Sequence, residues 1–383
     1  MLWRIFRLAL EAIGGLLVLF VCAALAYNYL VHYQSKLEAW PSKSTFAAPV
    51  VWSPDNSKLV RILTIDGGGM QGIASLEILK HLEQKSGRPL SEMFDFVAGT
   101  STGAIVASLL LLPDENGKPK YTVEDAAQIY SDLSQQIFIV PFFHRVFTLD
   151  GLLGPRFLNH GKFIESSEVF RGYRFGELIR PAMIPAYSRS TSDLHVFLNL
   201  NEPDANLRLG PLIAAATSAP SIFPGVELLG HSKLEGMYDD AGLILNNPAH
   251  RAFEYVLTRN PNSEIVVVSV GTSQTQIVTR DIDLYGGLVD WLVPLHAMVS
   301  KGQAGLSTRS LETLERVGTV VNLKSFRFAA PIPLDSGVFD ASKSNIERLK
   351  KAGRVYVSEN QTELAEALQS LVGPDRHMTR QSR

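Results

Sequence analysis

The feature that most constrains the fold is a strand-like run that leads directly into a glycine-rich turn and then a helix. Residues 59–65 have the β-branched, apolar composition of a strand, and residues 66–72 read Asp-Gly-Gly-Gly-Met-Gln-Gly. Residues 73–85 then place apolar side chains on one helical face, with Gly87 as a stop signal. This order predicts a βα unit of a mostly parallel sheet, and so an α/β fold.

A second unit of the same kind follows. Residues 94–98 form a short apolar run, residues 99–103 read Gly-Thr-Ser-Thr-Gly, and residues 104–110 are strongly apolar. A serine on such a sharp strand-to-helix turn presents its hydroxyl above the sheet, although a Gly/Ser turn can also simply begin a buried helix. Adjacent parallel units would bring the glycine-rich turn and Ser101 to one end of the sheet.

The spacing of Gly67, Gly69 and Gly72 also satisfies the G-x-G-x-x-G pattern of dinucleotide sites. Such a site needs an acidic residue at the end of the next strand to hold the ribose hydroxyls. The next strand ends in residues 99–103 instead, which contain no acid. The glycine-rich turn therefore predicts a backbone anion site at a helix N-terminus rather than a dinucleotide site.

A nucleophilic serine needs a base, and the candidates lie further along the chain. Residues 237–243 read Met-Tyr-Asp-Asp-Ala-Gly-Leu, and residues 246–248 read Asn-Asn-Pro before an amphipathic stretch. The Asn-Pro pair is a helix start signal that explains Asn247. It does not explain the two acids, so Asp239 and Asp240 are both candidates for the base.

The three elements together, in this order, resemble the patatin-like phospholipase family. Residues 214–224 and 265–272 support the resemblance, which covers roughly residues 60–371. It implies a three-layer α/β/α domain, a modified α/β-hydrolase with a mostly parallel central sheet. It also implies hydrolysis of fatty-acyl esters of membrane phospholipids by a Ser–Asp dyad that needs no cofactor.

By position, the resemblance makes Ser101 the nucleophile and Asp240 the base, because the spacing of Asp240 to residues 242 and 246–248 matches. It assigns the oxyanion hole to the amides of the loop formed by Gly67, Gly68 and Gly69. The remaining motif glycines are Gly72, Gly99, Gly103 and Gly242.

The chain departs from the family pattern at Gln71, where arginine is usual, and at Ala241, where glycine is usual. Two alternatives stay open. One is a Ser-Asp-His esterase or lipase whose histidine is His250 or His296. The other is a catalytically inactive, membrane-tethered binding protein.

The N-terminus holds nineteen uncharged residues at positions 13–31. As a helix they extend about 28 Å, close to the thickness of a bilayer's hydrocarbon core. The run fits a single-pass membrane anchor of undecided sidedness. It also fits a signal peptide cleaved near Ala26, which would leave a secreted or periplasmic protein, or a buried helix of the domain.

The chain is accordingly divided into an anchor or signal segment (1–34), a linker (35–58), a patatin-like domain (59–372) and a polar tail (373–383). One segment, residues 137–157, concentrates five phenylalanines among prolines and glycines. It fits either core packing or a lid or acyl-chain pocket.

Composition removes several other functions. A net charge of −2 with no basic patch argues against nucleic acid as a partner. The single cysteine, Cys22, excludes an internal disulfide or a cysteine-based metal site, and the nine histidines show no metal-ligand spacing. We therefore expect no metal and no cofactor, with an acyl-ester lipid and the membrane as partners.

Overall fold

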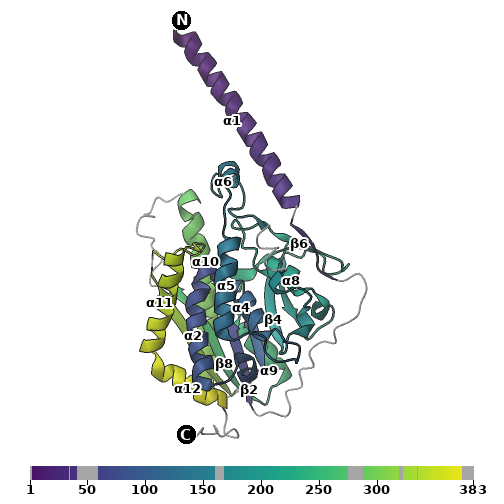
Figure 1. Cartoon of the computed structure of the whole chain (residues 1–383), viewed down its shortest axis with the longest axis vertical. Coiled ribbons are helices and arrows are strands. Elements are labelled where there is room, and N and C mark those ends of the chain that lie inside the picture. Colours follow the sequence, from purple (N-terminus) through teal and green to yellow (C-terminus); the bar gives the residue numbers. More distant parts are fainter. Residues whose placement is uncertain are drawn as a thin grey trace.

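The long helix α1 (Leu2–Tyr33) projects from an α/β domain that holds the rest of the described chain (Figure 1). The polar tail expected over 373–383 lies outside the described residues. The computed structural model describes residues 2–33, 35–40, 59–159, 168–274, 288–318, 322–333 and 335–372.

The described strands form one nine-stranded mixed sheet in the order β1-β6-β7-β4-β3-β2-β8-β9, with β5 paired to β4. The central run from β4 to β9 is parallel, while β5 and β7 lie antiparallel to β4 and β6 lies antiparallel to β7. The mostly parallel sheet predicted from the sequence is therefore confirmed. The strands are β1 (Lys36–Glu38), β2 (Leu59–Ile65), β3 (Phe96–Gly99), β4 (Ala182–Ser188), β5 (Asp193–Leu198), β6 (Val226–Leu229), β7 (Gly236–Asp240), β8 (Glu264–Gln274) and β9 (Leu323–Ile332).

Helices cover both faces of the sheet, so the domain has the three layers expected. Along β2, Val60 and Ile62 belong to a core shared with α9 and α10, whereas Leu63 and Ile65 belong to a core shared with α2 and α4. Both faces of the central strands are thus buried, as parallel strands require. The helices are α2 (Gly72–Ser86), α3 (Leu90–Met93), α4 (Thr102–Leu111), α5 (Val123–Ile137), α6 (Phe142–Thr148), α8 (Leu209–Ala216), α9 (Ala249–Arg259), α10 (Leu288–Val317), α11 (Lys343–Glu359) and α12 (Gln361–Val372), with single 3₁₀ turns η1 (Gly69–Gln71), η2 (Phe175–Glu177), η3 (Asp204–Asn206) and η4 (Ala241–Leu243).

Helix α1 stands away from the domain over most of its length (Figure 1). Its stretch Trp3–Leu30 is long and apolar enough to cross a membrane, and only 6% of its most apolar window is buried. The interpretation of this segment as a buried helix of the domain is therefore wrong. A membrane span and a signal sequence both remain consistent with its length and composition.

The residues just after α1 are part of the sheet rather than of a linker. Strand β1 lies parallel to β6, with Leu37 opposite Leu228, and Trp40 is buried in the core next to it. The linker expected over 35–58 therefore does not include residues 35–40. Its remaining part, residues 41–58, lies outside the described residues.

A buried ion pair fixes the end of the central strand β2. Asp66, the first residue after β2, is almost fully buried, and both of its carboxylate oxygens accept hydrogen bonds from the Arg327 guanidinium of β9. Arg327 also donates to the Ser269 hydroxyl on β8, at 2.8 Å. The pair therefore ties three adjacent strands together where the glycine-rich turn begins.

Replacing Arg327 by methionine should leave the Asp66 carboxylate buried without its partner. We expect a loss of about 3 kcal/mol in the free energy of unfolding, measured by urea denaturation of the full chain in detergent. Lys324→Met, on the same strand, is the matched control, because its pair with Glu366 is exposed and should contribute less than about 1 kcal/mol. Equal losses for the two variants would contradict this interpretation.

Candidate active site

Ser101 lies on a strained turn between β3 and α4. Its φ of 53° and ψ of −121° place a non-glycine residue in a sparsely populated region of backbone space. The preceding residue anchors the turn, since the Thr100 N–H donates to the Ile65 carbonyl (3.1 Å) and its hydroxyl donates to the Leu245 carbonyl (2.8 Å). The serine at the centre of the Gly-x-Ser-x-Gly motif thus has the strained backbone that such turns impose.

Asp240 reaches the same place because β3 and β7 share one edge of β4. Strand β3 runs parallel to β4, with Ala98 opposite Met183, and β7 runs antiparallel, with Asp240 opposite Ala186. Strand β5 occupies the other edge at both positions. The carboxyl ends of β3 and β7 therefore point at each other across three residues of β4, about 10 Å. Ser101 lies just beyond β3, toward that gap.

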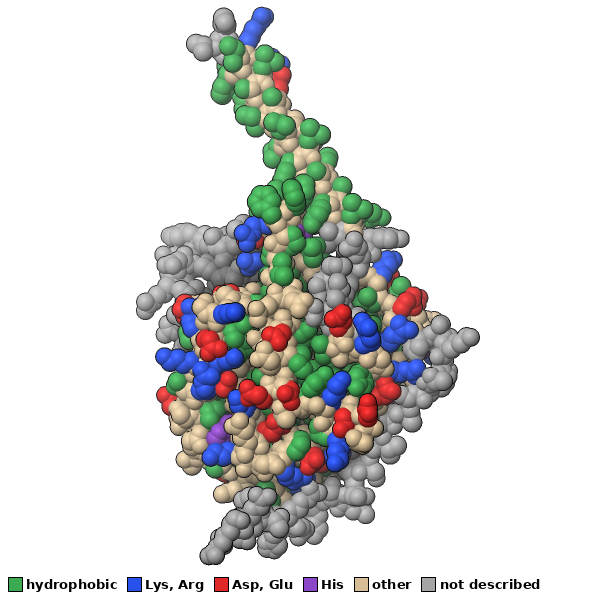
Figure 2. Space-filling model, in the orientation of Figure 1, with side chains coloured by type: hydrophobic (Ala, Val, Ile, Leu, Met, Phe, Trp, Pro, Cys, Tyr) green, Lys and Arg blue, Asp and Glu red, His purple; other side chains and the backbone are tan. Residues whose placement is uncertain are grey.

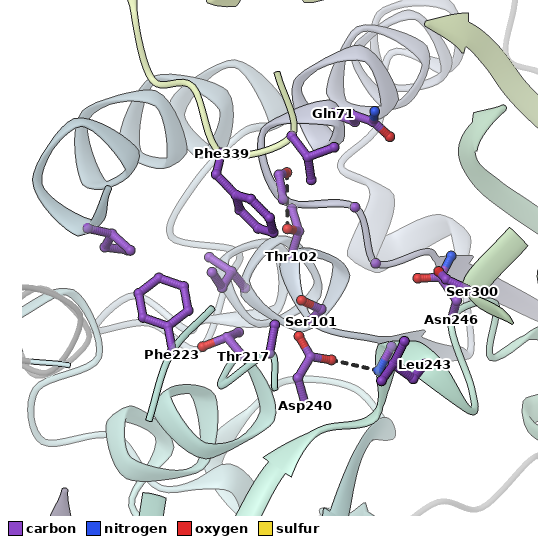
Figure 3. A pocket seen from close by; sticks show the side chains of 18 of the residues that line it. Gln71, Ser101, Thr102, Thr217, Phe223, Asp240, Leu243, Asn246, Ser300 and Phe339 are labelled. Carbon is purple, nitrogen blue, oxygen red and sulfur yellow. Dashed lines mark hydrogen bonds between the residues drawn. The ribbon is translucent and has the colours of Figure 1, made fainter. Parts of the chain in front are cut away.

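The Asp240 side chain is turned toward Ser101 (Figure 3). Its backbone N–H donates to the Ser218 carbonyl (3.0 Å), and its Oδ1 accepts the Gly242 N–H (2.7 Å). The neighbouring Asp239 points to the opposite face of the strand, as alternate residues do. There it receives two hydrogen bonds from Arg189, at 2.5 and 2.7 Å, and these raise the pKa of that guanidinium.

The glycine-rich loop lies directly beside Ser101. A Cβ atom added to Gly67 would be 2.8 Å from the Asn246 Oδ1 and 3.1 Å from the Ser101 Cβ, so a side chain there would push against both residues. The Gly67 N–H donates to the Asn246 carbonyl, at 3.1 Å. The expectation that Gly67, Gly68 and Gly69 all offer their amides is therefore corrected. Of these three amides, those of Gly68 and Gly69 have no acceptor among the described residues.

Three hydrogen bonds fix the orientation of the Gly69 backbone, two to its carbonyl and one from the next amide. Its φ is +55°, and its carbonyl accepts hydrogen bonds from the Thr102 hydroxyl (3.1 Å) and the Tyr130 hydroxyl (2.8 Å). Burial raises the pKa of Tyr130 to about 12, so the phenol keeps the proton that it donates. The next amide, that of Met70, donates to the Val338 carbonyl at 2.8 Å. The loop is preorganised without any ligand.

These groups line one pocket, which also has an extensive apolar wall. Ser101, Asp240, Gly68 and Gly69 belong to its lining. For the aromatic-rich segment 137–157, the sequence left core packing and an acyl-chain pocket open. Each holds for a different residue, because Phe138 lines the pocket whereas Phe157 is buried in a small core cluster. A polar end and an apolar wall suit an acyl ester. The wall includes Ile105, Ile137, Phe138, Phe223, Leu243 and Phe339.

Two polar side chains lie beside the loop, and one of them, Lys301, was not found from the sequence. Gln71 is buried and its Oε1 accepts the Thr272 hydroxyl (3.2 Å), while Lys301 of α10 lines the pocket and donates to the Thr272 carbonyl (3.0 Å). No motif surrounds Lys301, so only the fold could reveal it. It brings a positive charge close to the turn where the family's usual arginine is replaced by Gln71.

The histidines do not form a triad in the described part of the chain. None of the described pocket-lining residues is a histidine. His250 lies on α9 with its Nδ1 3.7 Å from Glu254, and the His296 side chain is outside the described residues. The described residues also contain no group of three or more His, Cys, Asp or Glu side chains that could hold a metal ion.

Comparison with known proteins agrees with this architecture. The family model described as "Patatin-like phospholipase" matches residues 63–253, which include all three sequence motifs. The chain belongs to the patatin-like phospholipase family.

Individual relatives are similar at modest identity. Patatin-like protein 2 of Oryza sativa subsp. indica is 25% identical over 354 residues, covering 80% of this chain and 86% of that protein. Probable inactive patatin-like protein 9 of Arabidopsis thaliana is 29% identical over 238 residues, covering 57% and 61%. Phospholipase A I of the same plant is 44% identical over 79 residues, covering 21% and 6%. Because one of these relatives is named probably inactive, membership alone does not establish catalysis.

Lys301 should make stability depend on pH. Burial lowers its pKa, the Asp66 charge opposes that shift, and Arg327 adds to it. The pKa of Lys301 in the folded chain is thus below the unfolded value of about 10.4. At pH values between these two pKa values, the unfolded chain binds more protons than the folded chain. The free energy of unfolding should therefore rise with pH there, by up to about 1.4 kcal/mol per unit.

The measurement compares urea unfolding of the native chain and of Lys301→Met from about pH 7 to about pH 10, the alkaline range below the lysine reference value. The native-minus-variant difference should increase with pH. Lys351→Met, on the exposed face of α11, should give a constant difference. A difference that stays constant for Lys301 as well would contradict a lowered pKa.

Proposed function

We propose that this protein is a membrane-anchored lipid acyl hydrolase of the phospholipase A type. The proposal depends on one observation. A serine on a strained turn and a carboxylate turned toward it line the same apolar pocket, next to amides that have no acceptor among the described residues. That combination supplies a nucleophile, a base and preset donors for an oxyanion.

The reaction begins with proton transfer from the Ser101 hydroxyl to the Asp240 carboxylate. The serine oxygen attacks the ester carbonyl carbon, and the amides of Gly68 and Gly69 stabilise the oxyanion by about 3 kcal/mol each. Collapse of this intermediate expels the lysolipid alcohol, which takes the proton from Asp240 and leaves an acyl-serine. Water then attacks the acyl-serine and gives its proton to Asp240. Asp240 returns this proton to the Ser101 oxygen as the C–O bond breaks and the fatty acid is released.

The substrate assignment rests on the apolar wall and on α1. A wall of aliphatic and aromatic side chains suits a fatty-acyl chain, and the family suits an acyl ester. Helix α1 is apolar and largely unburied. Its residue Phe20, which cleavage near Ala26 would remove, stacks on Phe147 of the domain, and this contact favours a retained membrane span over a cleaved signal.

The competing function is that of an inactive relative, and a serine-directed fluorophosphonate separates the two. We expect the probe to label the native chain. Ser101→Ala should abolish labelling and lower phospholipid hydrolysis at least about a thousandfold. Ser221→Ala is the matched control, since this exposed serine also has a positive φ (67°) and should leave labelling intact. Labelling that persists in Ser101→Ala would move the nucleophile elsewhere.

The two neighbouring acids should separate catalysis from stability. Asp240→Asn keeps an acceptor for the Gly242 amide but cannot take a proton, so activity should fall about as far as in Ser101→Ala. Asp239→Asn should keep its activity and lose about 1–2 kcal/mol, because its partner Arg189 is half-exposed. Steady-state kinetics and thermal unfolding of both variants provide the readouts. The reverse pattern would make Asp239 the base.

A further inference from the structure

Residues 139–153, called the rim segment below, expose large apolar side chains. Phe142 and Phe143 are 73% and 70% exposed, and Ile139 and Leu152 are exposed as well. Hydrophobic side chains continue from α1 onto this end of the domain (Figure 2). A cluster of this kind, facing outward on one short segment, marks an interaction surface rather than ordinary surface variation.

The rim segment packs directly against α1 (Figure 1). The Phe147 ring stacks on Phe20 and Tyr27, with ring centres 6.2 and 5.1 Å apart, and the Tyr27 hydroxyl lies 3.1 Å from Nδ1 of the fully buried His144. These contacts join the segment to one side of the helix.

The position of these contacts along α1 indicates where the rim segment would lie relative to a membrane. Phe20 lies eleven residues before the end of the uncharged run at residue 31, which is about 16 Å along the helix axis. If α1 crosses a bilayer with this run in the hydrocarbon, a segment that touches Phe20 cannot lie in bulk water. It must enter the membrane beside the helix.

The last part of the rim segment, residues 149–153, meets the strictest requirement for lipid contact, which is that the backbone hydrogen-bonds internally. The amides of residues 149–153 all donate to carbonyls within the segment, at 2.8–3.3 Å. The Leu153 carbonyl accepts from the Asn28 side chain, and the Thr148 hydroxyl donates to the His144 carbonyl. A stretch of loop in water does not need all of its amides bonded in this way, because solvent can satisfy them.

The exposed apolar residues also adjoin the pocket. Ile137 and Phe138 line the pocket immediately before the rim segment. On the facing helix α10, Ala297 and Ser300 line it as well, and the two residues between them, 298 and 299, are exposed and apolar. At the start of the rim segment and in α10, residues that line the pocket are therefore followed directly by exposed apolar residues.

We propose that the rim segment inserts into the lipid leaflet beside α1 and that its occupant is the bilayer itself. The inference rests on the proposed membrane span of α1. Insertion would set the apolar mouth of the pocket against the acyl chains, so that a lipid tail could enter without crossing water. It also assigns a role to the exposed phenylalanines, which the catalytic groups do not use.

The test measures depth with a fluorophore on single cysteines of the full chain. The dye nitrobenzoxadiazole is attached to native Cys22 or, in a Cys22→Ala background, to Phe142→Cys or Glu359→Cys. Each protein is reconstituted in phosphatidylcholine nanodiscs with and without lipid that carries a nitroxide on its acyl chain. Glu359 is the control because it is exposed at the end of α11.

We expect the nitroxide lipid to quench the dye at positions 22 and 142 at least about twofold and to leave position 359 unchanged, since only lipid-embedded sites lie near acyl chains. Quenching at 22 but not at 142 would overturn the inference while keeping the span. A shielded but unquenched dye at 142 would also overturn it, because a second copy or a partner protein would then cover the segment. No quenching at 22 would overturn both the span and the inference.

A functional readout separates this inference from the proposed chemistry. Phe142→Asp combined with Phe143→Asp should lower hydrolysis of bilayer phospholipid about tenfold or more, because two charges must enter lipid. Hydrolysis of a short-chain nitrophenyl ester should stay within about twofold of the native rate, since neither residue lines the pocket. An equal loss on both substrates would contradict the inference. A native chain that cleaves neither ester would refute the proposed function, and the depth measurement would still decide the insertion.

Discussion

The candidate site depends on one constraint of the sheet, which is that two strands of opposite direction share a single edge of β4. Because β3 runs with β4 and β7 runs against it, their carboxyl ends face each other. Ser101 and Asp240 lie at those two ends, and the glycine-rich turn after β2 lies alongside, so close that a Cβ on Gly67 would be 3.1 Å from the Ser101 Cβ. A parallel β7 would carry its aspartate away from the serine, so strand direction determines whether the two side chains can meet.

Local features were predictable because short stretches of sequence determine them. The βα units around the glycine-rich turn and around Ser101 follow from apolar periodicity and glycine spacing, and the structure has both. One boundary moved where tertiary structure intervened. The strand predicted over residues 94–98 is observed at Phe96–Gly99, because Phe94 caps α3 and the Asp95 carboxylate accepts the Arg61 N–H. Other features depend on contacts between segments that are distant in the sequence. These are the strand directions, the hydrogen bond from the Gly67 amide to the Asn246 carbonyl, and the position of Lys301 in the pocket. No periodicity encodes such contacts, so sequence patterns could not reveal them.

The aromatic-rich segment shows why one interpretation for a whole stretch can fail. Its first residues line the pocket, Phe157 packs in a core cluster, and Phe142 and Phe143 face outward. Composition is the same in all three places, and only the environment differs. The hydrophobicity of a side chain indicates that it avoids water. It does not indicate whether the side chain lies in a protein core, a ligand cavity or a lipid phase.

The short connection between α1 and the sheet limits which lipids the pocket can reach. Only two residues separate Tyr33, the end of α1, from Lys36 at the start of β1, and Ser35 is itself buried and bonded to Asn159. In the proposed arrangement the domain therefore cannot swing on a tether toward a neighbouring vesicle. It would sample lipids by diffusing laterally with its own membrane, so turnover would depend on the composition of a single leaflet and on how quickly products leave it.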